Sequence, residues 1–218
     1  MLDNTFKMGL LLVLLLGNIA MTTGAYNYIA NKSEIDSTKG PFSHMVLNNR
    51  TGNIYAGAMN SLYEFSSDLE LIKSTTTGPR DDNPNCHPRN INESCDQPKT
   101  SMNVYNKALV IDYNNNKLIA CSSLYHGICE RYNLSDIQSN DPENYVPAVA
   151  NDATSTTVAF IAPGPLMVSS TSMVLYVAAS RTNAGQSVFR DFVPALASRT
   201  LETFDLFYKG INTSTSKI

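Results

Sequence analysis

Short apolar stretches alternate with turn-forming residues along residues 42–73. The alternation predicts strands, and the clusters of Asn, Gly and Ser between them predict tight turns. The predicted strands are Phe42–Leu47, Ile54–Ala58, Ser61–Phe65 and Leu69–Lys73. Four short strands joined by short turns indicate one antiparallel sheet.

The same unit restarts twice further along the chain. The strands predicted in these later units are Ala108–Tyr113, Leu118–Ser122, Gly127–Arg131, Asn144–Ala150, Thr156–Ala162, Met173–Ala179 and Gln186–Arg190. The second strands share an apolar pair followed by small residues, as in Ile54–Ala58, Leu118–Ser122 and Leu175–Ala179. A repeated four-stranded sheet is typical of β-propeller blades, and a single β-sandwich is the alternative. Helical patterning is scarce, and Ser198–Tyr208 is the best helix candidate.

The N-terminal residues have the pattern of an export signal. Lys7 precedes the uncharged run Met8–Leu16, and Thr23–Ala25 offers small residues for cleavage. Residues 1–25 are therefore predicted to be a signal peptide, followed by a polar leader at 26–41. A transmembrane anchor is the alternative, but the run is shorter than the roughly 20 apolar residues of a span.

Four cysteines in an exported chain predict two disulfides. Three pairings are possible, and short loops favour the sequential one, Cys86 with Cys95 and Cys121 with Cys129. The first pair lies in Thr77–Ser101, a proline-rich segment that is predicted to be a stapled loop. The cysteine spacings differ from those of zinc sites, and the three histidines are isolated from one another. These histidines are His44, His87 and His126.

Five Asn-x-Ser/Thr sequons are candidate glycosylation sites in an exported protein. They are Asn31, Asn49, Asn92, Asn133 and Asn212. Charged residues make up 16% of the chain and the net charge is −3, without a cluster of Lys or Arg, so the sequence does not indicate a nucleic-acid partner. The sequence lacks the motifs of serine hydrolases, phosphate-binding loops and metalloproteases, which favours a binding module without a cofactor over a secreted enzyme.

Several motifs, in order along the chain, resemble the sema domain of the plexin receptors. Thr51–Asn60 is similar to the family signature TGx(I/V/L)YVGAxN, and Thr77–Pro88 is similar to TGPxxDxPxCxP. Three second-blade motifs and the SRxL that follows the third blade also have counterparts, in Asn106–Asp112, Lys117–Cys121, Gly127–Cys129 and Ser198–Leu201. Ser122 stands where the family usually has Gly, and His126 where Gln is common. Semaphorins and scatter-factor receptors share part of this pattern, but differ before the third cysteine or carry additional cysteines.

The resemblance implies an all-β fold, a seven-bladed propeller of which residues 42–218 would hold about the first three blades as an N-terminal, truncated portion. It also implies sequential disulfides. The implied function is semaphorin recognition by a receptor for cell and axon guidance, with a co-receptor or a second plexin chain as further partners. The membrane would be reached only through a span that is absent from this chain.

The polar segment Ser135–Tyr145 is the candidate ligand-binding segment, through Asp136, Asp141 and Glu143, and a solvated connector is the alternative. A truncated soluble decoy, and a sema domain of a semaphorin or scatter-factor receptor, are the alternative functions. The full receptor would stand at the extracellular face of the plasma membrane. The chain alone would be secreted or retained in the secretory pathway, because three blades leave apolar faces in water.

Overall fold

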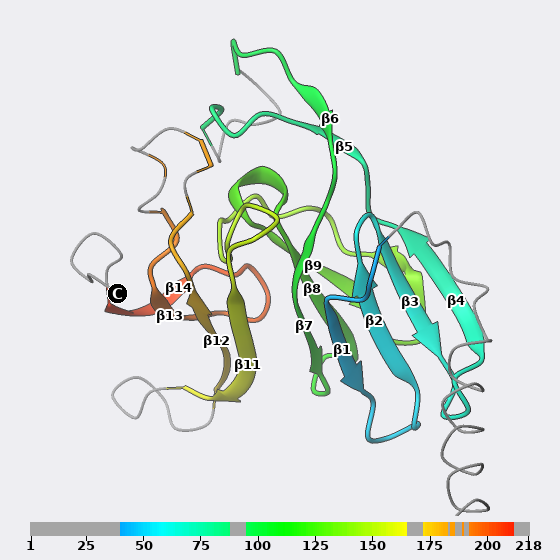
Figure 1. Cartoon of the computed structure of the whole chain (residues 1–218). Helices are drawn as coiled ribbons and strands as arrows, with labels where there is room; N and C mark the ends of the chain where they lie inside the picture. Colours follow the sequence, from blue (N-terminus) through cyan, green and yellow to red (C-terminus); the bar gives the residue numbers. More distant parts are fainter. Residues whose placement is uncertain are drawn as a thin grey trace, which may run out of the picture. The chain divides into compact units, whose positions relative to one another are not determined.

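The described strands form three four-stranded antiparallel sheets and one two-stranded sheet (Figure 1). The structure is a computed structural model, and it describes residues 40–87, 95–164, 172–182, 184–185, 189 and 192–211, with only the backbone of residues 208–211. The predicted signal peptide and most of the leader lie outside these residues. No helix within the described ranges has the length and apolar character needed to cross a membrane.

Each four-stranded sheet is a blade whose strands follow one another in the order of the chain. Blade 1 contains β1 (His44–Leu47), β2 (Ile54–Ala58), β3 (Ser61–Phe65) and β4 (Leu71–Thr76). Blade 2 contains β7 (Asn106–Asp112), β8 (Lys117–Ser122), β9 (Cys129–Asn133) and β10 (Asp136–Asn140). Blade 3 contains β11 (Thr157–Pro163), β12 (Met173–Ala179), β13 (Leu196–Arg199) and β14 (Leu206–Ile211). The β-sandwich alternative is therefore wrong.

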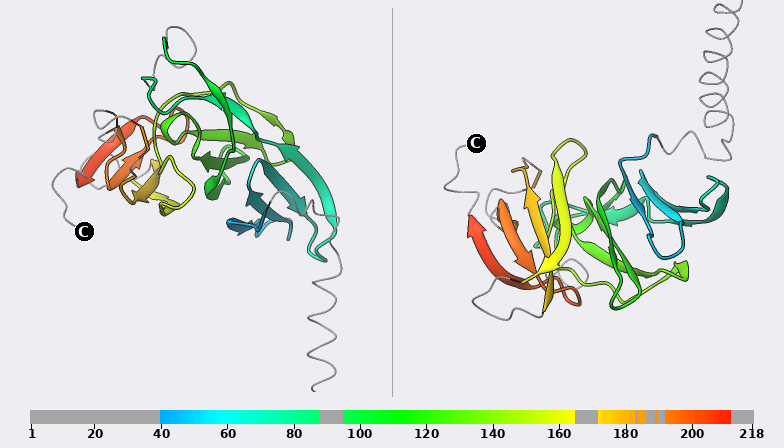
Figure 2. Two further views of the ribbon diagram at one scale, coloured as in Figure 1. Left: turned by 45° about the horizontal axis from the view of Figure 1, so that its top comes forward. Right: turned by 90° about the horizontal axis from the view of Figure 1, so that it is seen from below.

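The blades lie side by side, with β7 in contact with both β1 and β11 (Figure 2). The second strands of the three sheets are β2, β8 and β12, the three segments whose sequences align as a repeat. Blade 3 has an apolar face directed away from blade 2, where Val158 and Phe160 are 64% and 54% exposed and Phe160 stacks on Tyr176. Apolar residues on both faces of a sheet are typical of propeller blades, which pack on either side.

The fourth strand of blade 2 was misplaced by the sequence. The structure has β10 at Asp136–Asn140, inside the segment expected to connect strands, while Asn144–Ala150 is not a strand. An outermost blade strand has one free edge and needs few apolar residues. Ile137 alone is fully buried in β10, so its sequence resembles a solvated connection.

Three other expectations were wrong. The third strand of blade 3 is Leu196–Arg199, whereas the segment expected there, Gln186–Arg190, lies mostly outside the described residues. Ser198–Tyr208 is not a helix but the end of β13, a turn and the start of β14, and Phe204 in that turn has φ of 58°. Residues 77–101 are not all loop, because β5 (Arg80–Asp82) pairs with β6 (Thr100–Met102).

Blades 1 and 2 approach each other closely at Gly57 of β2 and Asn106 of β7. A Cβ at Gly57 would lie 2.3 Å from Asn106 Cγ. Asn106 Nδ2 donates to the carbonyls of Ala108 and Cys121, both at 3.3 Å, and Asn106 Oδ1 lies 3.0 Å from His44 Nδ1. Only a residue without a side chain fits opposite this bonded asparagine.

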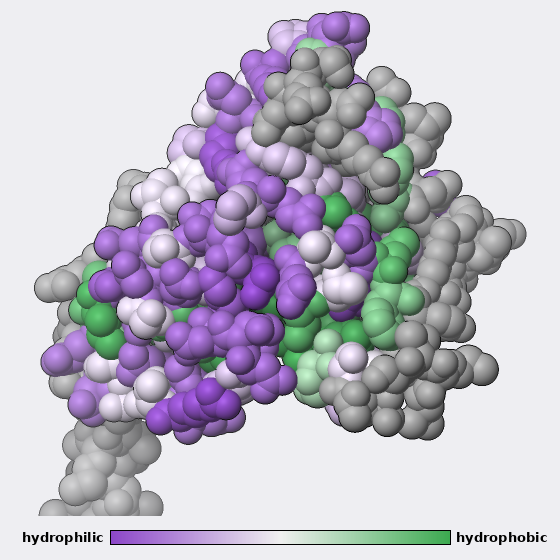
Figure 3. All heavy atoms as spheres, turned by 180° about the vertical axis from the view of Figure 1, so that it is seen from behind, coloured by the Kyte–Doolittle hydropathy of each residue, from purple (hydrophilic) through white to green (hydrophobic). Residues whose placement is uncertain are grey.

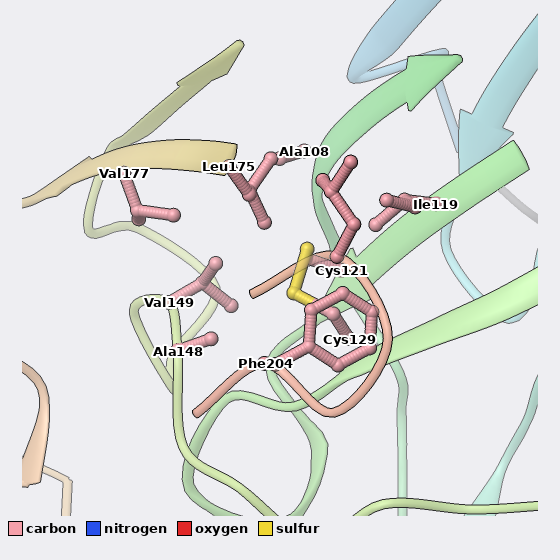
Figure 4. Packing of buried hydrophobic residues seen from close by; sticks show 10 residues of the cluster. Ala108, Ile119, Cys121, Cys129, Ala148, Val149, Leu175, Val177 and Phe204 are labelled. Atoms are coloured by element: carbon pink, nitrogen blue, oxygen red, sulfur yellow. A yellow bond between two sulfur atoms is a disulfide. The ribbon is translucent and has the colours of Figure 1, made fainter. Parts of the chain in front are cut away.

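Blades 2 and 3 share an apolar core that surrounds a disulfide (Figure 4). Cys121 of β8 and Cys129 of β9 form this bond, and the ring of Phe204 lies beside it. Leu175 and Val177 of β12 enter the same cluster from blade 3. The disulfide therefore ties two neighbouring strands at the point where two blades pack together.

Candidate partner-binding surface

A polar groove runs along the rim between blades 1 and 2, at the end where β4 leads into β5. It has a volume of about 330 Å³. One wall is the chain from Thr75 to Arg80, and the other consists of Glu130 and Tyr132 of β9, Gln138 and Asn140 of β10, and Glu143. We refer to this hollow as the rim groove. Blade 1 lies in the left half of Figure 3, where hydrophilic residues cover most of the visible surface.

Arg80 is the centre of the charged groups in the rim groove. Its Nη1 donates to Glu130 Oε1 at 3.0 Å, its Nη2 bonds to Glu143, and its guanidinium lies 5.2 Å from the Tyr125 ring centroid. Burial is the largest single effect on the pKa of Arg80 and lowers it, but the interactions with Glu130 and Tyr125 together outweigh burial and hold this pKa above its ordinary value. Tyr132 donates to Glu130 Oε2 at 3.3 Å, and burial raises the pKa of this tyrosine.

The outer strands of the two blades are tied together beside the groove. Lys73 of β4 and Asp136 of β10 form an ion pair with 2.9 Å between Nζ and Oδ1, and the hydrogen bond from Lys73 lowers the pKa of Asp136. Gln138 Nε2 donates to the Ser74 carbonyl at 3.1 Å. This bond occupies a carbonyl on the free edge of β4, where edge strands otherwise present unpaired groups to other chains.

The three acids of the candidate ligand-binding segment each pair with a basic residue of this chain. Asp136 pairs with Lys73 and Glu143 with Arg80, as described above. Asp141 Oδ1 lies 2.5 Å from Lys117 Nζ, and its Oδ2 lies 3.5 Å from Arg131 Nε. The segment is thus a row of neutralised ion pairs and not an unpaired acidic surface.

Arg80, Glu130 and Tyr132 were not among the residues predicted to form a site. Arg80 lies within a recognisable motif, but its partner Glu130 is 50 positions away, on a strand of another blade. Pairing across this separation depends on how the blades pack, for which the sequence carries no local signal.

The segment 80–102, of which residues 80–87 and 95–102 are described, forms an arm held against blade 2, and we refer to it as the stapled arm. Cys86 and Cys95 are joined by a disulfide, so the structure has the sequential pairing for both cysteine pairs. The carboxylate of Asp82 accepts from the Tyr125 backbone N–H at 2.8 Å, and His126 Nε2 lies 2.6 Å from the Cys86 carbonyl oxygen. Burial lowers the pKa of His126.

A turn of unusual backbone receives these two contacts. The short 3-10 helix η3 (Leu124–His126) contains Tyr125 with φ of 48° and His126 with φ of 67°, both in the left-handed region. Such conformations cost roughly 1 kcal/mol or more per residue and persist where surrounding contacts hold them. Asp82 holds this turn through Tyr125, which explains why an aspartate follows the TGP motif at this spacing.

Two of the five sequons lie in the described part of the chain. Asn49 is exposed in the turn between β1 and β2, and Asn133 is the half-buried last residue of β9. Asn31, Asn92 and Asn212 lie outside the described residues. Within the described ranges, no three His, Cys, Asp or Glu side chains are grouped so as to hold a metal ion.

Known proteins share this arrangement of blades and motifs. No family model matches the chain. Human Plexin-A4 is 50% identical over 96 residues, which are 44% of this chain and 5% of Plexin-A4. Mouse Plexin-A2 is 36% identical over 138 residues, which are 61% of this chain and 7% of Plexin-A2. The solved extracellular region of plexin A4, domains 1 to 8, aligns over 79% of this chain and 19% of its own length, with a TM-score of 0.62 and 31% identity. The chain belongs to the plexin family.

This membership identifies the three blades as part of a plexin sema β-propeller. The chain is similar to a portion of the plexin extracellular region, and this similarity implies a location in the secretory pathway or at the cell exterior. It spans 5–7% of the length of the plexins named above. The motif that starts at Thr77 supplies most of one wall of the rim groove and the start of the stapled arm, whereas the opposite wall of the groove lies outside the motifs quoted above.

Proposed function

We propose that this chain is part of the semaphorin-recognition region of a plexin-like receptor for cell and axon guidance. The observation that carries the proposal is the match to the solved plexin A4 extracellular region over 79% of the chain at 31% identity. Semaphorins are the ligands that the plexin resemblance implies. A co-receptor or a second plexin chain is the further partner.

We place the contact with the semaphorin at the rim groove. The groove is polar, and its ion pairs are held by residues of two blades, which gives a rigid, pre-organised surface. Interfaces between folded proteins need well-fixed polar groups at their rims, and pre-organisation reduces the entropy lost on binding. The bonded Arg80 and Glu130 supply such fixed groups without an ordering step.

A glycan placed in the groove tests this location. Thr75→Asn creates an Asn-Thr-Thr sequon on a groove-lining residue, and Ser74→Asn creates one at the neighbouring position of the same strand. Ser74 is the matched control, because it pairs with Tyr63, on the face of the sheet that is turned away from blade 2. Both variants are expressed in mammalian cells as the full receptor, and binding of soluble semaphorin ectodomain dimers is titrated.

Thr75→Asn should weaken semaphorin binding at least tenfold, while Ser74→Asn should bind like the wild type. Equal binding by both variants, with the added glycan verified by mass spectrometry, would contradict a contact at the groove. Absence of saturable binding to the wild type at the cell surface would contradict semaphorin recognition itself.

The three paired acids form a separate part of the proposal. We infer that Asp136, Asp141 and Glu143 contribute to the contact surface together with their basic partners. Neutral variants at these positions, Asp136→Asn, Asp141→Asn and Glu143→Gln combined, should lower semaphorin affinity by breaking the fixed row of charges. Unchanged affinity of the combined variant would remove the three acids from the contact surface.

A further inference from the structure

The strand β5 belongs to both the rim groove and the stapled arm, and it leaves the blades at the upper end of Figure 1. Side chains alternate along its pairing with β6, so Arg80 and Asp82 lie on the same face of this ribbon. Both residues contact Tyr125 of η3, Arg80 at the ring and Asp82 at the backbone N–H. Arg80 lines the rim groove, whereas Asp82 lines a separate cavity of about 180 Å³. Tyr125 therefore connects an arm residue outside the groove with the central charge inside it.

Three consecutive residues at the end of η3 have left-handed backbone. Tyr125, His126 and Gly127 have φ of 48°, 67° and 91°. Residues other than glycine rarely adopt this conformation, so surrounding contacts must hold the first two residues there. The Asp82 carboxylate accepts from the Tyr125 N–H at 2.8 Å, and the Cys86 carbonyl oxygen lies 2.6 Å from His126 Nε2. Both contacts come from the stapled arm, which therefore fixes the turn.

The conformation of the turn sets the position of the Tyr125 ring. The ring is buried in the apolar cluster that includes the disulfide of the stapled arm. The Arg80 guanidinium lies 5.2 Å from the ring centroid, within the roughly 6 Å that cation–π contacts span. Tyr145 meets the ring edge-on, with 5.2 Å between the centroids, and its hydroxyl bonds to Glu143, which is itself a partner of Arg80. These contacts close a circuit around the guanidinium.

We infer that Tyr125 is the positioning residue of the rim groove, and that the docked stapled arm controls semaphorin binding there by holding Tyr125 under Arg80. An arginine side chain has several rotatable bonds, and fixing it before binding reduces the entropy lost on association. Without the arm contacts, the turn would leave the left-handed region and withdraw the ring from the guanidinium. The inference rests on the proposed function, because the property that the arm controls is the affinity of the rim groove.

Substitutions of Tyr125 test the role of the ring in the full receptor on mammalian cells, with soluble semaphorin ectodomain dimers as the titrant. Tyr125→Leu removes the aromatic face and should weaken binding about tenfold, a loss typical of a displaced interface arginine. Tyr125→Phe keeps the face and should restore most of the affinity. Tyr113→Leu is the matched control, because Tyr113 lies 4.7 Å from the Arg50 guanidinium and does not line the groove. It should bind like the wild type, and unchanged affinity of Tyr125→Leu would overturn the inference.

A double-variant cycle separates positioning of Arg80 from a general structural role of the ring. If Tyr125 acts through the guanidinium, Tyr125→Leu should have little further effect in the Arg80→Gln background. If the ring only fills the apolar cluster, its loss should weaken binding equally in both backgrounds. Equal losses would therefore overturn the inference even though the single variant binds weakly.

Substitutions of Asp82 test control by the stapled arm, because this residue does not line the rim groove. Asp82→Ala should weaken semaphorin binding and speed hydrogen exchange of the Tyr125 amide, while Asp82→Asn keeps an acceptor oxygen and should preserve both properties. Faster exchange with unchanged affinity would overturn control by the arm. Should Asp82→Ala or Tyr125→Leu be retained in the cell, Asp82→Glu displaces the carboxylate and provides the same comparison in both Arg80 backgrounds.

The inference and the proposed function fail in distinguishable ways. A wild-type receptor without saturable semaphorin binding would contradict the proposed function. Weak binding by Thr75→Asn together with wild-type affinity of Tyr125→Leu and Asp82→Ala would contradict the present inference and leave the rim groove as the contact.

Discussion

Gly57→Ala is the substitution that most directly tests how blades 1 and 2 pack. The added methyl group would lie 2.3 Å from Asn106 Cγ, 2.5 Å from Asn106 Oδ1 and 2.8 Å from Asn106 Cβ. The last distance matters most, because a Cβ cannot move aside without the backbone of β7. The side chain of Asn106 is buried and bonded to two carbonyls and to His44, so it has no other rotamer available at low cost.

The size of the effect follows from two destabilising terms and one stabilising term. Overpacking of this kind costs about 1–3 kcal/mol, and a buried amide forced off its partners costs about 1–3 kcal/mol more. Replacing Gly by Ala in a strand otherwise stabilises by roughly 0.5–1 kcal/mol, because the unfolded chain loses freedom. We therefore expect Gly57→Ala to lower the free energy of unfolding by about 3 kcal/mol, which corresponds to a fall in Tm of about 10 °C for a domain of this size.

The assay is urea-induced unfolding of the purified receptor ectodomain, followed by circular dichroism, for Gly57→Ala, Asn106→Gly and the double variant. If Asn106 is the obstruction, removing its side chain relieves the clash, and the two substitutions should be coupled by at least about 1 kcal/mol. Unchanged or increased stability of Gly57→Ala, or strictly additive effects in the double variant, would refute the packing described for these blades.

Three further predictions concern individual side chains. His126→Gln should reduce the loss of stability on acidification from about pH 7.5 to about pH 5. Burial lowers the pKa of His126, so the unfolded state takes up the proton first and acid destabilises the wild type. Gln can still donate to the Cys86 carbonyl, and equal losses in Tm for both proteins would contradict the prediction. Arg80→Ala should lower the free energy of unfolding in urea by about 2–3 kcal/mol, since it leaves the buried Glu130 carboxylate without its guanidinium partner. An unchanged free energy of unfolding would contradict a stabilising role for the Arg80–Glu130 pair. Burial raises the pKa of Tyr55 to about 12, so the stability that this hydroxyl contributes is present below pH 10 and lost toward pH 12. The difference in stability between the wild type and Tyr55→Phe should therefore shrink over that range. A constant difference would contradict the role of this hydroxyl.

The parts of the fold that the sequence predicts are those in which apolar residues alternate between clear turns. β2 and β3 have the predicted bounds, because the Asn-Arg-Thr-Gly-Asn turn and the Met59–Asn60 turn leave no other place for the strands. Asn60 has φ of 62° in that second turn, a conformation that Asn tolerates better than most residues. Local patterning and local conformational preference agree at these positions.

The missed elements are those whose apolar residues are few or whose partners are distant. β10 has one fully buried residue, so no alternation marks it, and its position follows from pairing with β9 and from the Lys73–Asp136 tie to blade 1. The rim groove depends in the same way on Arg80 meeting Glu130 across two blades. Packing between repeats, which a single sequence does not encode locally, decides both features.

A cryo-electron microscopy structure of the full extracellular receptor bound to a semaphorin ectodomain would test the account most directly. We expect density for the semaphorin over the rim groove between β4 and β10. A semaphorin seated elsewhere on the propeller, with the rim groove open to solvent, would contradict it.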